Sequence, residues 1–179
     1  NVEVRGAETA EIPEDCRKGE EIAVLPFDSS ARAFGEGGAA IESAQFLASD
    51  GTPLKSVRGG ESVRLAVRAR ALKPLDLPAI GFIVRAPDGQ HLFGDTGTPG
   101  AIPQLPEGGV METVFDFVLP RLANGNYSIG LSVSTGRLDE HHIQIWNHNA
   151  LQFQVQSGLP LQGVLLGLPM RSITISECK

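Results

Sequence analysis

The segment Phe115-Asp-Phe-Val-Leu119 and the stretch that follows it to residue 155 decide the fold of this chain, because apolar and polar residues alternate along them. Alternation with a period of two is typical of a strand that buries one face. Pro120 ends the first such segment, and the sequence Leu122-Ala-Asn-Gly-Asn-Tyr127 turns the chain. These features predict two strands separated by a turn.

The second of these strands has one bulky face and one nearly bare face. Its apolar residues alternate with small ones, in the order Tyr127, Ser128, Ile129, Gly130, Leu131, Ser132, Val133, Ser134. A tyrosine at the start of a strand, directly after a glycine turn, is typical of the tyrosine corner of an immunoglobulin-like sandwich. Tyr127 is therefore expected to point inward, while the bare outer face leaves room for a ligand.

The composition indicates a folded domain of short strands. Apolar residues make up 41% of the 179 residues, and the chain contains 21 Gly and 12 Pro. This favours many strands joined by turns. The net charge of −6 argues against nucleic acid and anionic membranes as main partners, because both require a basic face. No apolar run approaches the roughly 20 residues that span a bilayer.

Further segments show strand periodicity or short apolar runs between turns, and none shows a helical stripe. Loops are expected at 95–109 and 136–142, and a Gly- and Leu-rich connector at 160–169. The sequence therefore predicts an all-β, immunoglobulin-like antiparallel β-sandwich. The expected strands are 40–48, 63–70, 79–85, 91–93, 111–119, 126–134, 149–156 and 171–176.

Two parts are expected along the chain. Residues 1–33 are acidic and contain prolines, which indicates a linker or leader, and residues 34–179 are expected to form the sandwich. The last strand, 170–177, follows the connector and could pair with a second copy, which predicts a dimer with an exchanged C-terminal strand. The two cysteines, Cys16 and Cys178, lie near the ends and indicate a reducing cytoplasm rather than a disulfide scaffold.

No motif for nucleotide binding or nucleophilic catalysis is present. His141, His142 and His148 surround Trp146, but adjacent histidines on a strand point to opposite faces, so no metal site and no cofactor are expected. A glycosidase needs two carboxylates about 5–10 Å apart. Nothing in the sequence brings together any two of the four candidates, Asp95, Asp116, Asp139 and Glu140.

Two features leave alternatives open. Arg64, Arg68 and Arg70 share one strand face, for which a solvated surface is favoured over anion recognition. Trp146 lies in Gln144-Ile-Trp-Asn-His-Asn149. An aromatic ring among amides and imidazoles has the composition of a sugar site, but a lone tryptophan also serves often in packing. Both readings of Trp146 remain open at this point.

An ordered set of motifs between residue 34 and about residue 156 resembles the C-terminal domain of Wzt, the nucleotide-binding subunit of ABC transporters that export O-antigen polysaccharide. The motifs are Gly35-Glu-Gly-Gly-Ala-Ala-Ile41, Asp50-Gly51, Gly60-Glu-Ser-Val63, Ile80-Gly-Phe82, Asp88-Gly89, Phe93-Gly-Asp-Thr96, Leu122-Ala-Asn-Gly-Asn-Tyr127 and Trp146-Asn-His-Asn-Ala150 with Phe153 and Val155.

The resemblance implies a carbohydrate-binding module that recognises the modified non-reducing end of a lipid-linked glycan and licenses its export. It implies a homodimer with an exchanged strand. It also implies an upstream nucleotide-binding (ATPase) domain, from which residues 1–33 would remain as linker, and a membrane permease as partners. The implied location is cytoplasmic and peripheral to the inner membrane. No catalytic residues are implied.

The residues themselves suggest where a glycan would bind. The outward face of the sheet formed by 79–85, 126–134 and 149–156 would have a floor of small residues, with glutamines along one wall. Arg85 would be the cation for an acidic terminal sugar. The alternatives are a structural dimerisation or protein-interaction domain without a glycan site, and a glycan-modifying enzyme. The expected site residues are Trp146, His142, Gln152, Gln154, Ser132 and Arg85.

Overall fold

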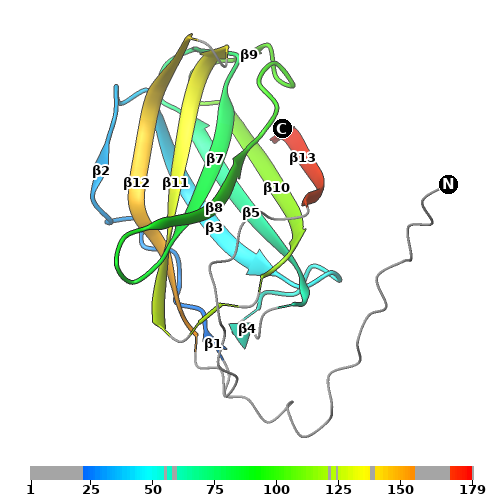
Figure 1. The fold of residues 1–179 in the computed structure, drawn as a ribbon. Coiled ribbons are helices and arrows are strands. Elements are labelled where there is room, and N and C mark those ends of the chain that lie inside the picture. Colours follow the sequence, from blue (N-terminus) through cyan, green and yellow to red (C-terminus); the bar gives the residue numbers. More distant parts are fainter. Residues whose placement is uncertain are drawn as a thin grey trace, which may run out of the picture.

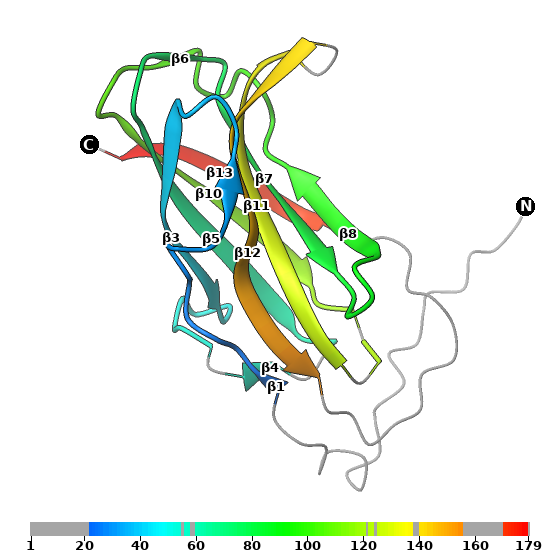
Figure 2. The same ribbon diagram turned by 90° about the vertical axis from the view of Figure 1, so that its left-hand side faces the viewer.

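The computed structural model describes residues 22–54, 56–57, 60–120, 122–123, 125–137, 140–155 and 170–178. Every regular element in these ranges is a β-strand, and two antiparallel sheets face each other as a sandwich (Figure 1). The view turned by 90° shows the two layers from the side (Figure 2). The predicted all-β antiparallel sandwich is therefore confirmed. Cys16 and Asp139 lie outside the described residues.

The first sheet has four strands in the order β13-β10-β5-β3. Alternate residues of β5 are buried because the strand covers the core with one face. β13 pairs with β10 of the same chain, so exchange of this strand between two chains stays a prediction. The strands are β3 (Ala39–Leu47), β5 (Ser62–Ala71), β10 (Val110–Val118) and β13 (Met170–Cys178).

The second sheet has five strands in the order β2-β12-β11-β7-β8. The segments 79–85, 126–134 and 149–156 were expected to share one sheet, and they do so as neighbouring strands, with residue 156 outside the described part. The strands are β2 (Ala33–Phe34), β7 (Ala79–Arg85), β8 (His91–Thr96), β11 (Gly125–Arg137) and β12 (Glu140–Val155).

Two short strand pairs complete the fold. β1 (Ile22–Ala23) pairs with β4 (Ser56–Val57), and β6 (Leu75–Asp76) pairs with β9 (Gln104–Leu105). The last of these strands lies within the predicted loop 95–109. Ile102 and Leu105 of that stretch are buried in the core, so apolar contacts hold the loop against the sandwich. The Gly and Pro content of the loop gave no indication of these contacts.

The predicted polar loop at 136–142 is mostly wrong. β11 continues to Arg137 and β12 begins at Glu140, and these two residues pair with each other at the end of a hairpin. This end of the hairpin is largely exposed on both faces. Its sequence therefore carries no alternation of apolar and polar residues, which is the signal on which the strand prediction relied.

The open side of β12 is covered by residues 24–37, which we call the edge segment. The Leu25 amide donates a 2.9 Å hydrogen bond to the Gln152 carbonyl, and the Asp28 amide donates one of 2.9 Å to the Ala150 carbonyl. Further along, β2 pairs with β12 through Phe34. Part of the predicted leader 1–33 therefore pairs with the sandwich.

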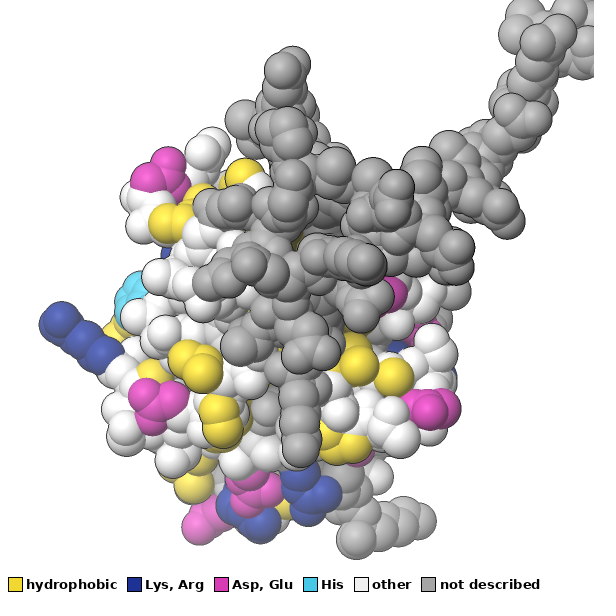
Figure 3. Space-filling model, turned by 90° about the horizontal axis from the view of Figure 1, so that it is seen from below, with side chains coloured by type: hydrophobic (Ala, Val, Ile, Leu, Met, Phe, Trp, Pro, Cys, Tyr) yellow, Lys and Arg dark blue, Asp and Glu magenta, His cyan; other side chains and the backbone are white. Residues whose placement is uncertain are grey.

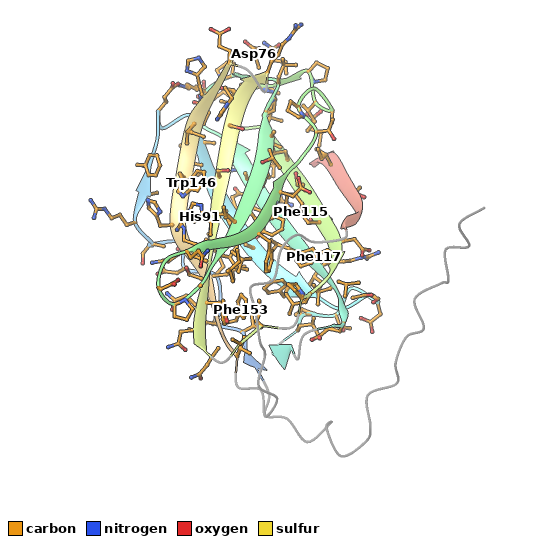
Figure 4. The ribbon with its side chains drawn as sticks, in the orientation of Figure 1. Asp76, His91, Phe115, Phe117, Trp146 and Phe153 are labelled. Atoms are coloured by element: carbon orange, nitrogen blue, oxygen red, sulfur yellow. The ribbon has the colours of Figure 1, made fainter. Side chains whose placement is uncertain are left out.

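Aromatic side chains fill the space between the sheets (Figure 4). The ring of Phe82 packs edge-on against Phe115, with centroids 4.7 Å apart, and stacks on Phe117 at 5.7 Å. Tyr127 is 5% exposed and stacks on Phe153, with ring centroids 5.4 Å apart. Its predicted inward orientation is confirmed.

Candidate functional site

A row of cross-strand partners runs over the whole five-stranded sheet. Phe34 on β2 pairs with Trp146 on β12, which pairs with Ser132 on β11. Ser132 pairs in turn with Gly81 on β7, and Gly81 pairs with Thr96 on β8. Directly opposed residues of antiparallel strands share one face. This row lies on the outer face, because the chain neighbours of Ser132 are buried in the core.

Gly81 is the residue of this row that has no side chain above the sheet. A Cβ atom at this position would lie 2.9 Å from Thr96 Oγ1 and 3.0 Å from Ser132 Oγ. The absence of a side chain therefore leaves a hollow between these two hydroxyl groups. Gly130, in the neighbouring row, is also without a side chain, and a Cβ there would be 3.3 Å from Ile83 Cγ2.

These positions open into a groove of ≈ 700 Å³ on the outer face. Such a volume lies in the range of small-ligand sites. Trp146 lies on one side of the floor, and β8 with the residues that follow it lies on the other. The lining residues are Gly81, Phe82, Ile83, His91, Leu92, Phe93, Gly94, Asp95, Thr96, Gly97, Thr98, Pro99, Gly130, Ser132 and Trp146.

Three rings gather at the Trp146 side of the groove. The ring of Phe34 stacks on Trp146 with centroids 6.1 Å apart and planes 19° apart. His148 contacts both, with its centroid 5.3 Å from Phe34 and 6.3 Å from Trp146. Phe34 is 54% exposed, whereas the indole nitrogen of Trp146 is buried and makes no hydrogen bond to any described residue. This side of the groove therefore offers ring faces rather than an indole donor.

Arg85 reaches across β11 toward the same aromatic cluster. Its Nη1 donates a 3.0 Å hydrogen bond to the His148 carbonyl, and its Cζ lies 6.0 Å from the centre of the Trp146 ring. The His148 carbonyl is available because the pairing of β12 with β11 is irregular beside Gly130. Arg85 thus ties β7 to β12 and contacts Trp146 beside the groove.

His142 lies away from the groove, contrary to its expected place beside Trp146. It pairs with Thr135, which stands three residues from Ser132 on β11 and so faces the other way. The Nδ1 of His142 is 3.0 Å from Glu36 Oε1, and the Gln144 amide donates to the second oxygen of Glu36 at 3.1 Å. The hydrogen bond from Gln144 and, to a smaller degree, that from His142 hold the pKa of Glu36 below its usual value.

Gln152 and Gln154 lie on β12 beyond the groove. Gln152 pairs with Ser128, and Gln154 pairs with Asn126, four and six residues along β11 from Ser132. At about 3.4 Å per residue, these positions are about 14 and 20 Å from the Trp146 row. Both side chains are exposed. Of the six expected residues, the structure therefore places Trp146 and Ser132 in the groove and Arg85 at its border, while three lie elsewhere.

The candidates for acid–base and metal chemistry are dispersed. Asp116 lies on β10 in the other sheet, where it faces Arg64 at 3.5 Å, whereas Asp95 is on β8 and Glu140 is at the hairpin end. In the described ranges no group of three His, Cys, Asp or Glu side chains could hold a metal ion.

The three arginines of β5 take part in ion pairs on the outer face of the four-stranded sheet. Arg64 pairs with Asp116, and Arg68 and Arg70 both pair with Glu42. In the view from below, basic and acidic side chains lie side by side at the lower edge of the picture (Figure 3). This arrangement supports the solvated-surface interpretation of these arginines.

Sequence reasoning missed several residues in the groove and beside it. Phe34 falls at the boundary of the predicted linker, in a strand of two residues that is too short to show a period. Gly81 belongs to the predicted strand 79–85, and a glycine inside an apolar central strand is a signal of close approach. Thr96 falls in the predicted loop 95–109, whereas β8 continues to this residue. His91 is the cross-strand partner of Arg85, a relationship that only strand register reveals.

Comparison with known proteins agrees with this architecture. A solved structure described as "Crystal structure of the C-terminal domain of wzt" superimposes with a TM-score of 0.65 at 19% sequence identity, over 79% of this chain and 87% of that chain. At this identity the likeness shows the fold. None of the curated proteins matches this chain. In the part of the chain described, no helix is long and apolar enough to cross a membrane.

A family model supplies the assignment that the fold alone does not. The model named Wzt C-terminal domain matches residues 30–166, which is well over half of the chain. This match includes both sheets apart from β13, and every residue that lines the groove. The chain belongs to the Wzt C-terminal domain family.

Proposed function

We propose that this domain is a non-catalytic carbohydrate-binding module that recognises the modified non-reducing end of a lipid-linked O-antigen polysaccharide. Membership of the Wzt C-terminal domain family supports a role in an O-antigen ABC transporter. The observation that carries the glycan assignment is the open groove next to the rings of Trp146 and Phe34. An aromatic wall beside a floor of small and hydroxyl-bearing residues suits a sugar better than a flat protein partner.

The chemistry of the groove matches the two kinds of surface on a pyranose. The apolar C–H face of a sugar packs against aromatic rings, here on the Trp146 side. The hydroxyl groups of a sugar both donate and accept hydrogen bonds, as do Ser132 and Thr96 on the floor and at the β8 wall. His91 adds a ring nitrogen at the end of the groove near Arg85.

The expected residues take different roles in this proposal. Trp146 and Ser132 contact the terminal sugar, and Arg85 positions Trp146 through its contacts with the ring and with the His148 carbonyl. Gln152 and Gln154 contact only a glycan that continues along β12. His142 holds the hairpin to Glu36 and does not contact the sugar.

The charges in the groove support binding without turnover. Among the described residues that line it, Asp95 is the one carboxylic acid. Glycoside hydrolysis by the common mechanisms uses a pair of carboxyl groups on either side of the scissile bond. The proposal therefore assigns recognition to this domain and chemical work to other parts of the transporter.

The proposal includes the partners and location that accompany such a role. The domain acts as a homodimer, in which β13 is exchanged between chains, and it follows a nucleotide-binding domain that engages a membrane permease. Its location is cytoplasmic, at the inner membrane. β13 supports the dimer because, among the described strands, it lies at the edge of its sheet beside β10.

A titration with natural glycan tests the proposal. The probe is the O-polysaccharide released from the lipopolysaccharide of the bacterium that encodes the chain. Trp146 is the single tryptophan, so its fluorescence reports on the groove directly. We expect a saturable change in emission with the intact polysaccharide, and a weaker one after its terminal residue has been removed. Arg64→Ala, on the other sheet, is the matched control and should bind like the parent chain.

The competing function is a structural interaction domain without a glycan site. It would be favoured if neither fluorescence nor calorimetry detects the polysaccharide at millimolar sugar concentration. Turnover of the polysaccharide during the titration would instead indicate a glycan-modifying enzyme.

A further inference from the structure

Phe34 is the most exposed of the large hydrophobic side chains in the described part of the chain. Its exposed fraction is 54%, compared with 51% for Leu25 and for Leu72. A single exposed apolar residue is ordinary on a protein surface. Phe34 differs because it stacks on Trp146 and touches His148, so it extends the aromatic side of the groove to the edge of the sheet.

The backbone that carries Phe34 is bonded to β12 at several points along the edge segment. β2 consists of two residues, and Phe34 is one of them. Before it, the amides of Leu25 and Asp28 donate to carbonyls of β12, and after it the Glu36 amide donates to the Ile143 carbonyl at 3.0 Å. The edge segment thus lies along β12 from one end of the aromatic cluster to well beyond the groove.

We infer that Phe34 is a second sugar-stacking residue of this groove, and that a glycan bound there also holds the edge segment, residues 24–37, against β12. This inference rests on the proposed function. A ligand that contacts Trp146 and Phe34 together bridges β12 and the edge segment. Such a ligand binds the docked arrangement better than the undocked one, and linkage requires that it stabilise docking by the same factor.

This arrangement connects the groove with the N-terminal part of the chain. The edge segment follows residues 1–23 in the sequence, and it is hydrogen-bonded to β12. Occupation of the groove therefore changes how firmly the chain that precedes residue 24 is attached to the domain. A transporter subunit could use this attachment to register that a glycan is bound.

Substitution of Phe34 tests the first half of the inference. Phe34→Ala should weaken binding of the released O-polysaccharide by about ten-fold, the effect of losing one stacking contact. Phe34→Tyr keeps a ring at this position and should restore most of the affinity. Leu72→Ala removes a side chain of similar exposure that directly follows β5 of the four-stranded sheet, and it should bind like the parent chain.

Amide hydrogen exchange tests whether a bound glycan holds the edge segment against β12. It measures how firmly the edge segment is attached to β12, and it does not depend on a measurement of glycan affinity. Saturating polysaccharide should slow exchange at the amides of Leu25 and Asp28 several-fold in the parent chain. In Phe34→Ala, at a polysaccharide concentration that saturates this variant, exchange at the same amides should change much less. A purely structural role of Phe34 would alter exchange without polysaccharide and leave this ligand-dependent difference intact.

The outcomes separate the inference from the proposed function. If the parent chain does not bind the polysaccharide, the proposed function and this inference are both wrong. If the parent chain and Phe34→Ala bind equally, or if protection at Leu25 and Asp28 is unchanged by ligand, the glycan role of the domain stands and the inference is wrong.

Discussion

The hydroxyl group of Tyr127 donates a 2.7 Å hydrogen bond to the backbone carbonyl of Ala123, four residues earlier in the chain. The bond closes the turn that precedes β11 and fixes the start of the strand that carries Ser132. The tyrosine corner predicted from the sequence is therefore present.

Tyr127→Phe should lower the free energy of unfolding by about 1 kcal/mol, because it removes one buried hydrogen bond and keeps the ring that stacks on Phe153. Urea denaturation of the two chains measures this difference. Affinity for the polysaccharide should not change, since Tyr127 faces the core. Lost binding with an unchanged midpoint would show that Tyr127 belongs to the site instead.

The ionisation of Tyr127 should weaken the fold at high pH. Burial, and to a smaller degree the Asp88 carboxylate, raise the pKa of Tyr127 above its ordinary value of 10.0. A raised pKa in the folded state means that the neutral phenol is favoured by folding. Its contribution is present below pH about 10 and is lost as pH rises through the folded pKa. Because the chain has one tyrosine, its ultraviolet absorbance follows this titration, and Tyr127→Phe should flatten the stability profile there.

Gly81→Val should block the groove. The new side chain starts 2.9 Å from Thr96 Oγ1 and 3.0 Å from Ser132 Oγ, and both are ends of side chains that can rotate away. The strand should therefore stay folded while the floor is filled. We expect polysaccharide affinity, measured by calorimetry, to fall at least about ten-fold, with a circular dichroism spectrum like that of the parent chain. Normal binding by Gly81→Val would place the ligand elsewhere.

Trp146→Ala should weaken polysaccharide binding by about ten-fold or more, as expected for loss of an aromatic platform worth about 1–3 kcal/mol. Gln152→Ala and Gln154→Ala should each have a smaller effect, because they lie beyond the groove and an exposed hydrogen bond contributes only about 0.5–1.5 kcal/mol. Calorimetry measures all three variants. If Arg64→Ala weakens binding and Trp146→Ala does not, the ligand binds on the outer face of the four-stranded sheet.

The chain should form a dimer in solution. Among the described strands, β13 lies at the edge of the four-stranded sheet beside β10, and pairing with a second copy would protect its other side. Light scattering should give roughly twice the chain mass of 19.0 kDa. Removal of residues 170–179 should produce monomers or aggregates. A monomer at high micromolar concentration would contradict the prediction.

The sequence by itself determined the class of the fold and the faces of its regular strands. The period of two in β5 and β11 is a local property, because successive side chains of a strand point to opposite faces. Burial then selects the apolar set, so Leu65 and Ile129 could be assigned to the core without knowledge of any neighbouring strand. The bare outer face of β11 was predicted from the same alternation.

Only the tertiary structure decided which residues share the candidate site. Strand register places Phe34 beside Trp146, although the two are far apart in the chain and β2 is too short to show a period. Register likewise brings Arg85 within hydrogen-bond distance of the His148 carbonyl. It also places His142 on the face opposite to Trp146, next to Glu36. Register depends on turns, irregular pairing and contacts with the other sheet together, so no local pattern encodes it.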